Sequence, residues 1–184
     1  MTKVELFFFD YACPFCNRAF RNLMDLLPEY SNIEMLWHPC EAHPRPDDNY
    51  GKHSDLCIQG MFYAAENGVA MVDYHKKIFE LYHRDKIDVE NISVLASALN
   101  DLLDPERFAQ ALTTGRYARA LEDANEYAYK EAGVWIIPEF RMESRRLAAE
   151  AGIGVAEEQL KEFLDLSNYG LCVSVGICTP DAVG

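Results

Sequence analysis

The chain opens with a short, nearly continuous apolar run that gives way to a helical pattern. Residues 4–9 read Val-Glu-Leu-Phe-Phe-Phe, as expected of a strand buried on both faces of a sheet. After residue 16, apolar side chains recur at helical spacing up to Pro28, which predicts a helix that ends there. Residues 33–37 form a second short apolar run. The pattern predicts a β-α-β unit at the start of the chain.

The middle of the chain carries helical patterns and no strand pattern. A loop rich in Pro, Asp and Asn covers about residues 40–50, and five predicted helices follow it. Capping residues place two of the starts: Ser54 precedes the first helix, and the pair Asp104-Pro105 opens the fourth. This helical region therefore interrupts the alternation of strand and helix.

Strand patterns resume after the helical region. Residues 134–142 are predicted to be a strand with a break at Pro138, and residues 147–149 are a weaker strand candidate. Residues 157–166 have the pattern of an amphipathic last helix. The two ends of the chain thus supply the strands, and the middle supplies helices.

We therefore predict an α/β fold with a central mixed sheet flanked by helices and a large all-helical insertion. Residues 1–52 and 133–166 would form the α/β domain, residues 53–132 the inserted helical subdomain, and residues 167–184 a C-terminal tail. A length of 184 residues suits one such domain with an insertion.

Composition narrows the class of protein and its partners. Hydrophobic residues make up 49% and aromatic residues 12% of the chain, which indicates a globular fold. A net charge of −13 argues against nucleic acid or an anionic membrane as a partner. No apolar run reaches the ~18 residues of a membrane span, and no signal-peptide pattern precedes the first strand. We expect a cytoplasmic protein, with monomer and homodimer both open.

The candidate chemistry lies in Cys13-Pro14-Phe15-Cys16, at the junction of the first predicted strand and helix. The chain has six cysteines, and in the cytoplasm such residues serve redox or metal roles more often than a disulfide framework. A thiol at a helix N-terminus faces unpaired N–H groups that favour the thiolate. We interpret Cys13 as the nucleophile in disulfide exchange and Cys16 as the thiol that resolves the mixed disulfide. Half of a zinc site is the alternative, disfavoured because no second ligand pair adjoins it.

Three neighbours are expected to tune this pair. Pro14 removes one N–H group from the helix start and fixes φ, and Phe15 adds neither charge nor donor. Asp10 could pass protons or raise the thiol pKa by like-charge repulsion. We favour a simpler role for Asp10 as a cap of the helix or the loop.

Two further groups of residues contain cysteines. Cys172 and Cys178 would be ~20 Å apart on a straight strand, too far for a disulfide, although a turn at Gly176 would allow one; inert thiols are the alternative. The other group has spacings that zinc could use: Cys40, His43, His53 and Cys57. For that group we favour buried cysteines and incidental histidines, so that no metal site is predicted.

The chain resembles the DsbA family of thioredoxin-fold proteins, and within it the cytoplasmic FrnE-like branch. Residues 4–16 carry its strand, Asp-aromatic and Cys-Pro-aromatic-Cys signature. Residues 37–44, Trp-His-Pro-Cys-Glu-Ala-His-Pro, are similar to its stretch after the second strand. Residues 133–140, Gly-Val-Trp-Ile-Ile-Pro-Glu-Phe, match its Gly-Val-x-x-(Val/Ile)-Pro-x-Phe segment. The resemblance covers about residues 3–166 and implies a thioredoxin fold.

The resemblance also implies roles for individual residues. Pro138 would be cis and lie beside Cys13, and the backbone of Ile137 would pair with an extended substrate segment. Strongly oxidising members of the family carry His where this chain has Phe15. The pair is therefore expected to be less oxidising than theirs.

We expect an enzyme, a protein disulfide oxidoreductase or isomerase that exchanges disulfides with protein or small-molecule thiols. No bound cofactor is expected, with glutathione open as a co-substrate. One alternative is a glutathione-dependent enzyme similar to kappa-class transferases or 2-hydroxychromene-2-carboxylate isomerases. Those branches usually carry Ser at the position of Cys13 and lack the second cysteine, so Cys16 argues against them. The other alternative is a zinc-binding or redox-sensing interaction module.

Overall fold

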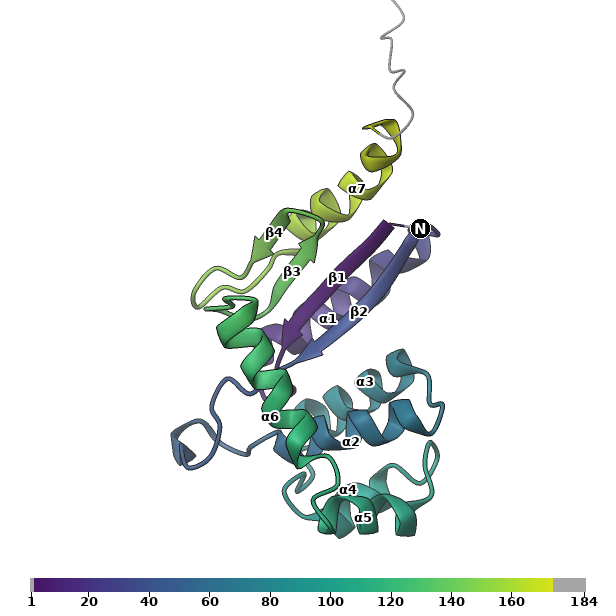
Figure 1. Ribbon diagram of the computed structural model, residues 1–184, viewed down its shortest axis with the longest axis vertical. Helices are drawn as coiled ribbons and strands as arrows, with labels where there is room; N and C mark the ends of the chain where they lie inside the picture. The colour runs from purple at the N-terminus through teal and green to yellow at the C-terminus, as the bar shows by residue number, and fades with distance from the viewer. Residues whose placement is uncertain (1, 174–184) are drawn as a thin grey trace, which may run out of the picture.

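The computed structural model describes the backbone of residues 2–173 and the side chains of residues 8–168 (Figure 1). A four-stranded sheet has the order β2-β1-β3-β4. Its strands are β1 (Thr2–Phe9), β2 (Ile33–Pro39), β3 (Glu139–Met142) and β4 (Arg145–Ala148). β1 is parallel to β2 and antiparallel to β3, which is in turn antiparallel to β4. The predicted mixed sheet is confirmed.

At Phe8 and Phe9, where its side chains are described, the first strand is buried on both faces. Phe8 and Phe9 alternate across the sheet and are both fully buried. Phe9 packs in the main core together with α1 (Pro14–Leu26). Phe8 packs in a second cluster with Cys40, under the π-helical segment η4 (Tyr127–Glu131). Helical segments thus cover both faces of β1 at the end of the sheet where α1 begins.

The helical insertion connects β2 to β3. The α-helices of this region are α2 (Asp55–Glu66), α3 (Met71–Phe79), α4 (Ile92–Ala98), α5 (Pro105–Thr113) and α6 (Ala118–Glu126). Figure 1 shows α2 to α5 gathered beyond the end of the sheet, with α6 leading back toward β3. Two of the helices continue into π-helical turns, α3 into η3 (Glu80–Arg84) and α6 into η4. The predicted number of helices here is confirmed.

Two predicted boundaries are wrong. The strand expected over residues 134–142 begins only at Glu139, because the N–H of Val134 donates to the carbonyl of Ala128 at 2.9 Å and so extends the hydrogen bonds of η4 instead of joining the sheet. The last helix, α7 (Glu157–Val173), runs past its predicted end at residue 166. There the buried Ser167 accepts hydrogen bonds from Asn32, which tie this part of α7 to the segment before β2.

Cys178 lies outside the described residues, so the structure does not test the expected choice between a Cys172–Cys178 disulfide and free thiols.

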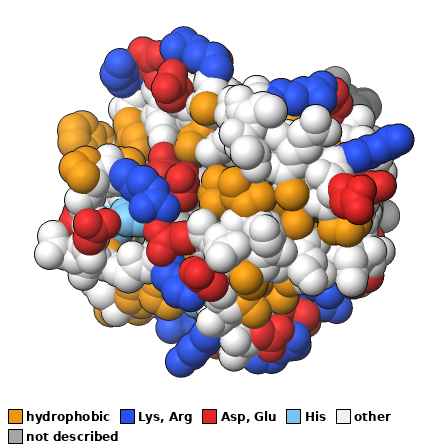
Figure 2. Space-filling view, turned by 90° about the horizontal axis from the view of Figure 1, so that it is seen from below, with side chains coloured by type: hydrophobic (Ala, Val, Ile, Leu, Met, Phe, Trp, Pro, Cys, Tyr) orange, Lys and Arg blue, Asp and Glu red, His pale blue; other side chains and the backbone are white. Residues whose placement is uncertain are grey.

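Within the described part of the chain, no helix is both long and apolar enough to cross a membrane. On the face seen from the helical insertion, acidic and basic side chains are interspersed with apolar ones (Figure 2). The acidic excess is not gathered into one patch on that face.

Candidate active site

Cys13 occupies the N-cap of α1. Its backbone is extended, with φ −78° and ψ 119°, and its sulfur accepts a hydrogen bond from the backbone N–H of Cys16 at 3.4 Å. Pro14 stands in the first turn of the helix, where a missing N–H costs nothing. The N–H of Cys13 itself donates to the carbonyl of Asp10 at 3.1 Å. The sulfur of Cys13 therefore lies where the free N–H groups of the helix start can stabilise a thiolate.

The two thiols of the pair have opposite environments. Cys13 is half-buried and Cys16 is fully buried, and both are free thiols. A hydrogen bond from the Cys16 thiol is the largest cause that lowers the pKa of Cys13, and N–H groups of Cys16 and Phe15 add to it. Burial is the largest cause that raises the pKa of Cys16 well above its ordinary value. At neutral pH the arrangement favours an accessible thiolate at Cys13 and a buried, protonated thiol at Cys16.

Asp10 joins three segments next to the pair. Its carboxylate accepts hydrogen bonds from the N–H of Ala12 at 2.8 Å, the N–H of Ala42 at 2.7 Å and the hydroxyl of Ser54 at 2.5 Å. Burial raises the pKa of Asp10, and these hydrogen bonds oppose the rise. These hydrogen bonds have the geometry of a loop cap, one of the two capping roles favoured for Asp10. Ser54 occupies the N-cap of α2 as predicted. Its hydroxyl donates to the carboxylate of Asp10, however, and makes no capping hydrogen bond to the helix.

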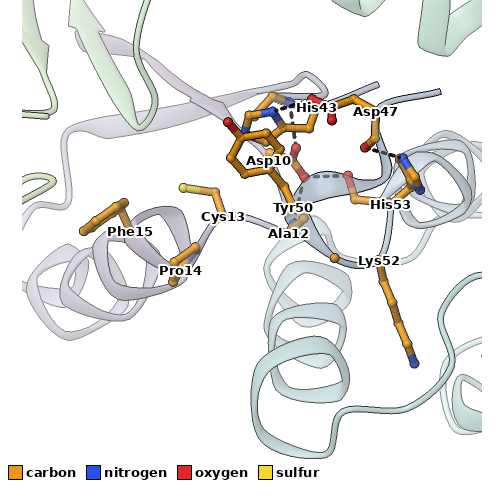
Figure 3. Close-up of a pocket in the computed structure, with 13 residues that line it drawn as sticks. Asp10, Ala12, Cys13, Pro14, Phe15, His43, Asp47, Tyr50, Lys52 and His53 are labelled. Atoms are coloured by element: carbon orange, nitrogen blue, oxygen red, sulfur yellow. Dashed lines mark hydrogen bonds and ion pairs between the residues drawn. The ribbon is translucent and has the colours of Figure 1, made fainter. Parts of the chain in front are cut away.

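A cavity of about 310 Å³ opens beside Cys13 (Figure 3). One wall comes from the β1–α1 loop and the first turn of α1, and the other from residues 42–54. His43 and Tyr50 stack on each other in this second wall, with ring centroids 3.6 Å apart. In Figure 3 the side chain of Lys52 points away from Cys13; its ammonium group bonds to the carbonyl of Ile87. The cavity therefore offers an aromatic stack and a sulfur nucleophile, with no lysine ammonium directed at them.

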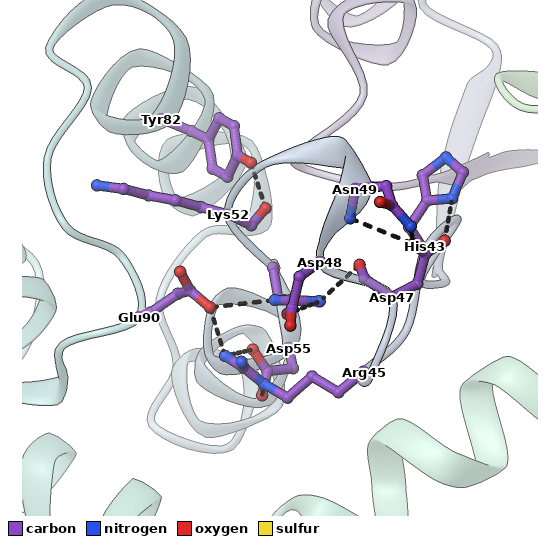
Figure 4. A network of polar contacts seen from close by, with 10 residues as sticks. His43, Arg45, Asp47, Asp48, Asn49, Lys52, Asp55, Tyr82 and Glu90 are labelled. Atoms are coloured by element: carbon purple, nitrogen blue, oxygen red, sulfur yellow. Dashed lines mark hydrogen bonds and ion pairs between the residues drawn. The ribbon is translucent and has the colours of Figure 1, made fainter.

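The wall formed by residues 42–54 is anchored to the helical insertion (Figure 4). Arg45 pairs with Asp55 at 3.3 Å and with Glu90 at 2.6 Å. The buried His53 contacts Glu90 through Nδ1 at 3.1 Å and the carbonyl of Asp47 through Nε2 at 3.2 Å. These contacts tie the second wall to the helical insertion.

The four residues whose spacing would suit zinc lie in different environments and contact different partners. Cys40 is buried in the Phe8 cluster, and Cys57 is buried in α2. His53 is bonded to Glu90, while His43 stacks on Tyr50. Among the described residues, no group of three His, Cys, Asp or Glu side chains is arranged to hold a metal ion.

The segment around Pro138 lies at the same end of the sheet. The Ile137–Pro138 peptide bond is cis, as the resemblance implied. Glu139 pairs with Phe8 of β1, so Pro138 adjoins the strand end that leads into Cys13. Ile137 is partly buried, and Trp135, two residues earlier, is 92% exposed.

Sequence reasoning missed the partners of the loop before Cys13. The hydroxyl of Tyr11 bonds to His75, and its carbonyl accepts from His83. Ser54, expected only as a helix cap, bonds to Asp10. Each partner is more than 40 residues away along the chain, and none carries a local motif that connects it to a thiol.

Residues 6–134 match the family described as DSBA-like thioredoxin domain. No curated protein sequence matches the chain significantly. A solved structure described as a probable DsbA oxidoreductase from Streptomyces coelicolor is similar with a TM-score of 0.73 and 15% identity, over 100% of this chain and 94% of that one.

Two further solved structures are similar. The cytosolic disulfide reductase DsbM from Pseudomonas aeruginosa, solved with GSH, has a TM-score of 0.67 and 15% identity over 91% of this chain and 99% of that one. Reduced DsbA1 from Neisseria meningitidis has a TM-score of 0.63 and 15% identity over 94% of this chain and 87% of that one. At these identities the likeness concerns the fold.

Proposed function

The chain belongs to the DSBA-like thioredoxin domain family, and we propose that it is a thiol–disulfide oxidoreductase acting through Cys13 and Cys16. The observation that carries the proposal is the contrast between the two thiols. Cys13 is accessible, N-capping and lowered in pKa, whereas Cys16 is buried and raised in pKa. Disulfide exchange needs this combination of an attacking thiolate and a nearby resolving thiol.

The reaction proceeds in two exchanges. The Cys13 thiolate attacks one sulfur of a substrate disulfide, and the other substrate sulfur leaves as a thiolate. Cys16 then loses its proton and attacks the sulfur of Cys13, which releases the second substrate thiolate and forms the Cys13–Cys16 disulfide. Two electrons pass from the cysteine pair to the substrate, and the reverse sequence oxidises a substrate dithiol. The potential of the partner decides the direction.

Neighbouring residues prepare the pair for this chemistry. Asp10 fixes the loop before Cys13, and Pro14 starts the helix whose N–H groups face the sulfur. Phe15 supplies an uncharged surface beside the cavity. We assign the backbone of Ile137, next to Pro138, to pairing with an extended substrate segment, which would hold a polypeptide without reading its sequence.

We also place the chain in the FrnE-like branch and in the cytoplasm. The three sequence segments of that branch support the assignment, and the structural likeness to a cytosolic disulfide reductase is in keeping with it. Glutathione is proposed as a co-substrate, since the cavity beside Cys13 admits a small thiol and DsbM was solved with GSH. Retention of Cys16 favours exchange over a glutathione transferase or isomerase reaction, because only exchange needs a resolving thiol.

The test is insulin reduction together with oxidation in a glutathione buffer, with wild type, Cys13→Ser and Cys57→Ala compared. We expect Cys13→Ser to lose at least a hundredfold in rate, because a hydroxyl is not ionised at neutral pH. Cys57 is buried in α2 and serves as the matched control, expected within twofold of wild type. Equal activity of wild type and Cys13→Ser would contradict the proposal.

Trapping tests the resolving thiol and the co-substrate. Cys16→Ser incubated with oxidised glutathione is expected to accumulate a mixed disulfide at Cys13, seen by mass spectrometry as the added mass of one glutathione. If that adduct does not form while the wild type still reduces insulin, glutathione is excluded as a co-substrate. Exchange with protein disulfides would remain the proposed activity.

A further inference from the structure

Two histidines of the helical insertion hold Tyr11, two residues before Cys13. The hydroxyl of Tyr11, whose ring is fully buried, bonds to Nδ1 of His75 on α3 at 2.8 Å. The main-chain carbonyl of Tyr11 bonds to Nε2 of His83 in η3 at 2.8 Å. One histidine therefore fixes the side chain of this residue, and the other fixes its backbone.

The two histidines differ in what they can do. His75 is fully buried, and burial lowers its pKa to about 3. Its ring is therefore neutral, and a hydrogen bond joins its Nδ1 to the hydroxyl of Tyr11. His83 is half-buried and lines a cavity of about 400 Å³ together with Ala12 and Pro14. A carbonyl oxygen can only accept, so Nε2 of His83 is the donor to Tyr11.

The bond from His83 acts on the peptide that leads to the nucleophile. The oxygen of the Tyr11–Ala12 peptide is held by His83, and the N–H of the same peptide is held by the carboxylate of Asp10 at 2.8 Å. Because the peptide group is planar, hydrogen bonds at both its oxygen and its nitrogen restrain its rotation about the neighbouring φ and ψ bonds. The next residue is Cys13, whose extended backbone allows its sulfur to accept the N–H of Cys16.

We propose that His83 is a positioning residue for Cys13: its Nε2–H fixes the Tyr11–Ala12 peptide and so keeps the Cys13 sulfur in reach of the N–H groups of α1. The inference rests on the proposed function only for the role of Cys13 as the attacking thiol. The placement of His83 depends on the π-helical turn η3, in which the N–H of Asp85 bonds to the carbonyl of Glu80. Such single π-turns frequently mark functional sites.

Two substitutions distinguish the effect of the Nε2–H donor of His83 from the effect of its aromatic ring. His83→Phe keeps an aromatic ring against Phe79, on which His83 stacks, but removes the donor. His83→Gln keeps an amide donor and removes the ring. We expect His83→Phe to slow alkylation of Cys13 by iodoacetamide at pH 7 about fivefold, with a raised thiol pKa in the pH profile. His83→Gln is expected to stay within twofold of wild type.

The measurement follows adduct formation at Cys13 by peptide mass spectrometry, with thermal unfolding run in parallel. Arg84→Gln is the control, since Arg84 pairs with Asp85 and Glu80 beside His83. It is expected to alkylate at the wild-type rate. If His83→Phe does not fold, His83→Asn replaces it, because its amide is too short to reach the carbonyl.

Either of two results would overturn the inference: a variant without the hydrogen bond to Tyr11 (His83→Phe or its replacement His83→Asn) that alkylates at the wild-type rate, or His83→Gln as slow as that variant. The second would mean that packing of the ring matters and the hydrogen bond does not. Alkylation requires no disulfide substrate. Failure of the proposed exchange activity in the insulin assay would therefore remain distinguishable from failure of this inference.

Discussion

Two parallel strands of the sheet, β1 and β2, end side by side. Each is followed by a cysteine, and the two cysteines differ in burial and in thiol pKa. After β1 the chain reaches Cys13 at the start of a helix, half-buried and lowered in pKa. After β2 the chain reaches Cys40, which is fully buried, and its N–H bonds to the carbonyl of Phe9. Burial is the largest cause that raises the pKa of Cys40.

The two strand ends give their cysteines different reactivity for structural reasons. Both cysteines lie at the carboxyl edge of the same sheet, and Asp10 is close enough to both to raise their pKa. Only Cys13 has a helix N-terminus to stabilise its thiolate and a cavity through which a substrate can approach. Helix geometry and access, more than residue type, decide which thiol reacts.

The largest expected difference between Cys13 and Cys40 is in their rates of alkylation. At pH 7.5 under native conditions, iodoacetamide is expected to modify Cys13 at least about a thousandfold faster than Cys40 or Cys57, since only the exposed thiolate reacts. The rate at Cys13 should fall as pH drops through the pKa of this thiol, which lies below its ordinary value. Peptide mapping by mass spectrometry gives all rates, and comparable rates at Cys13 and Cys40 would refute the contrast.

The next largest effect concerns Asp10, which ties the two strand ends together through Ala12 and Ala42. Asp10→Ala leaves buried donors without an acceptor and should lower the free energy of unfolding by about 2 kcal/mol at pH 7. Asp25→Ala, at an exposed site on α1, is the control and should change it by less than about 0.5 kcal/mol. Urea unfolding measures both, and equal stabilities would show that Asp10 is not a tie.

The loss of unfolding free energy in Asp10→Ala should depend on pH, because the pKa of Asp10 is raised in the folded state. Because the folded state holds the proton of Asp10 more tightly than the unfolded state, this group stabilises the fold most below 3.8 and loses that stabilisation as pH rises through the folded pKa. The penalty of Asp10→Ala should therefore be larger at acid pH than at pH 7. A penalty that shrinks on acidification would mean that the carboxylate is favoured by the fold.

A smaller effect is expected from adding charge at the reactive strand end. Phe15→His places a cation-forming ring beside Cys13, so the thiolate and hence the reduced pair should be stabilised. We expect about a tenfold change in the exchange equilibrium with glutathione, or roughly 30 mV toward a stronger oxidant. Phe15→Gln controls for the lost ring, and an equal shift in that variant would assign the effect to packing.

The smallest effect is expected at the unreactive strand end. Cys40→Ala removes a buried sulfur and should cost about 1 kcal/mol of folding stability through the small cavity that it leaves. Exchange activity should stay within twofold of wild type, because Cys40 lacks both access and a helix N-terminus. A large loss of exchange at unchanged stability would make Cys40 a participant.

Much of the local structure could be predicted from short patterns. The run at residues 4–9 and the helix behind Cys16 follow from periodicity, and the structure contains both. Asp104 caps α5 through its side chain as predicted. The strand expected from residue 134 failed because the backbone there continues the hydrogen bonds of η4, a contact set by how the preceding helix ends.

The class of fold and the position of the cysteine pair could be predicted from the sequence, because strand periodicity, helix capping and a Cys-x-x-Cys at a helix start are all local. The contacts that hold the loop before Cys13 follow only from the tertiary structure. His83 meets Tyr11 across 72 residues, His75 meets it across 64, and Ser54 meets Asp10 across 44. Hydrogen bonds of that reach exist only after the helical insertion has packed against the end of the sheet, so no local pattern encodes them.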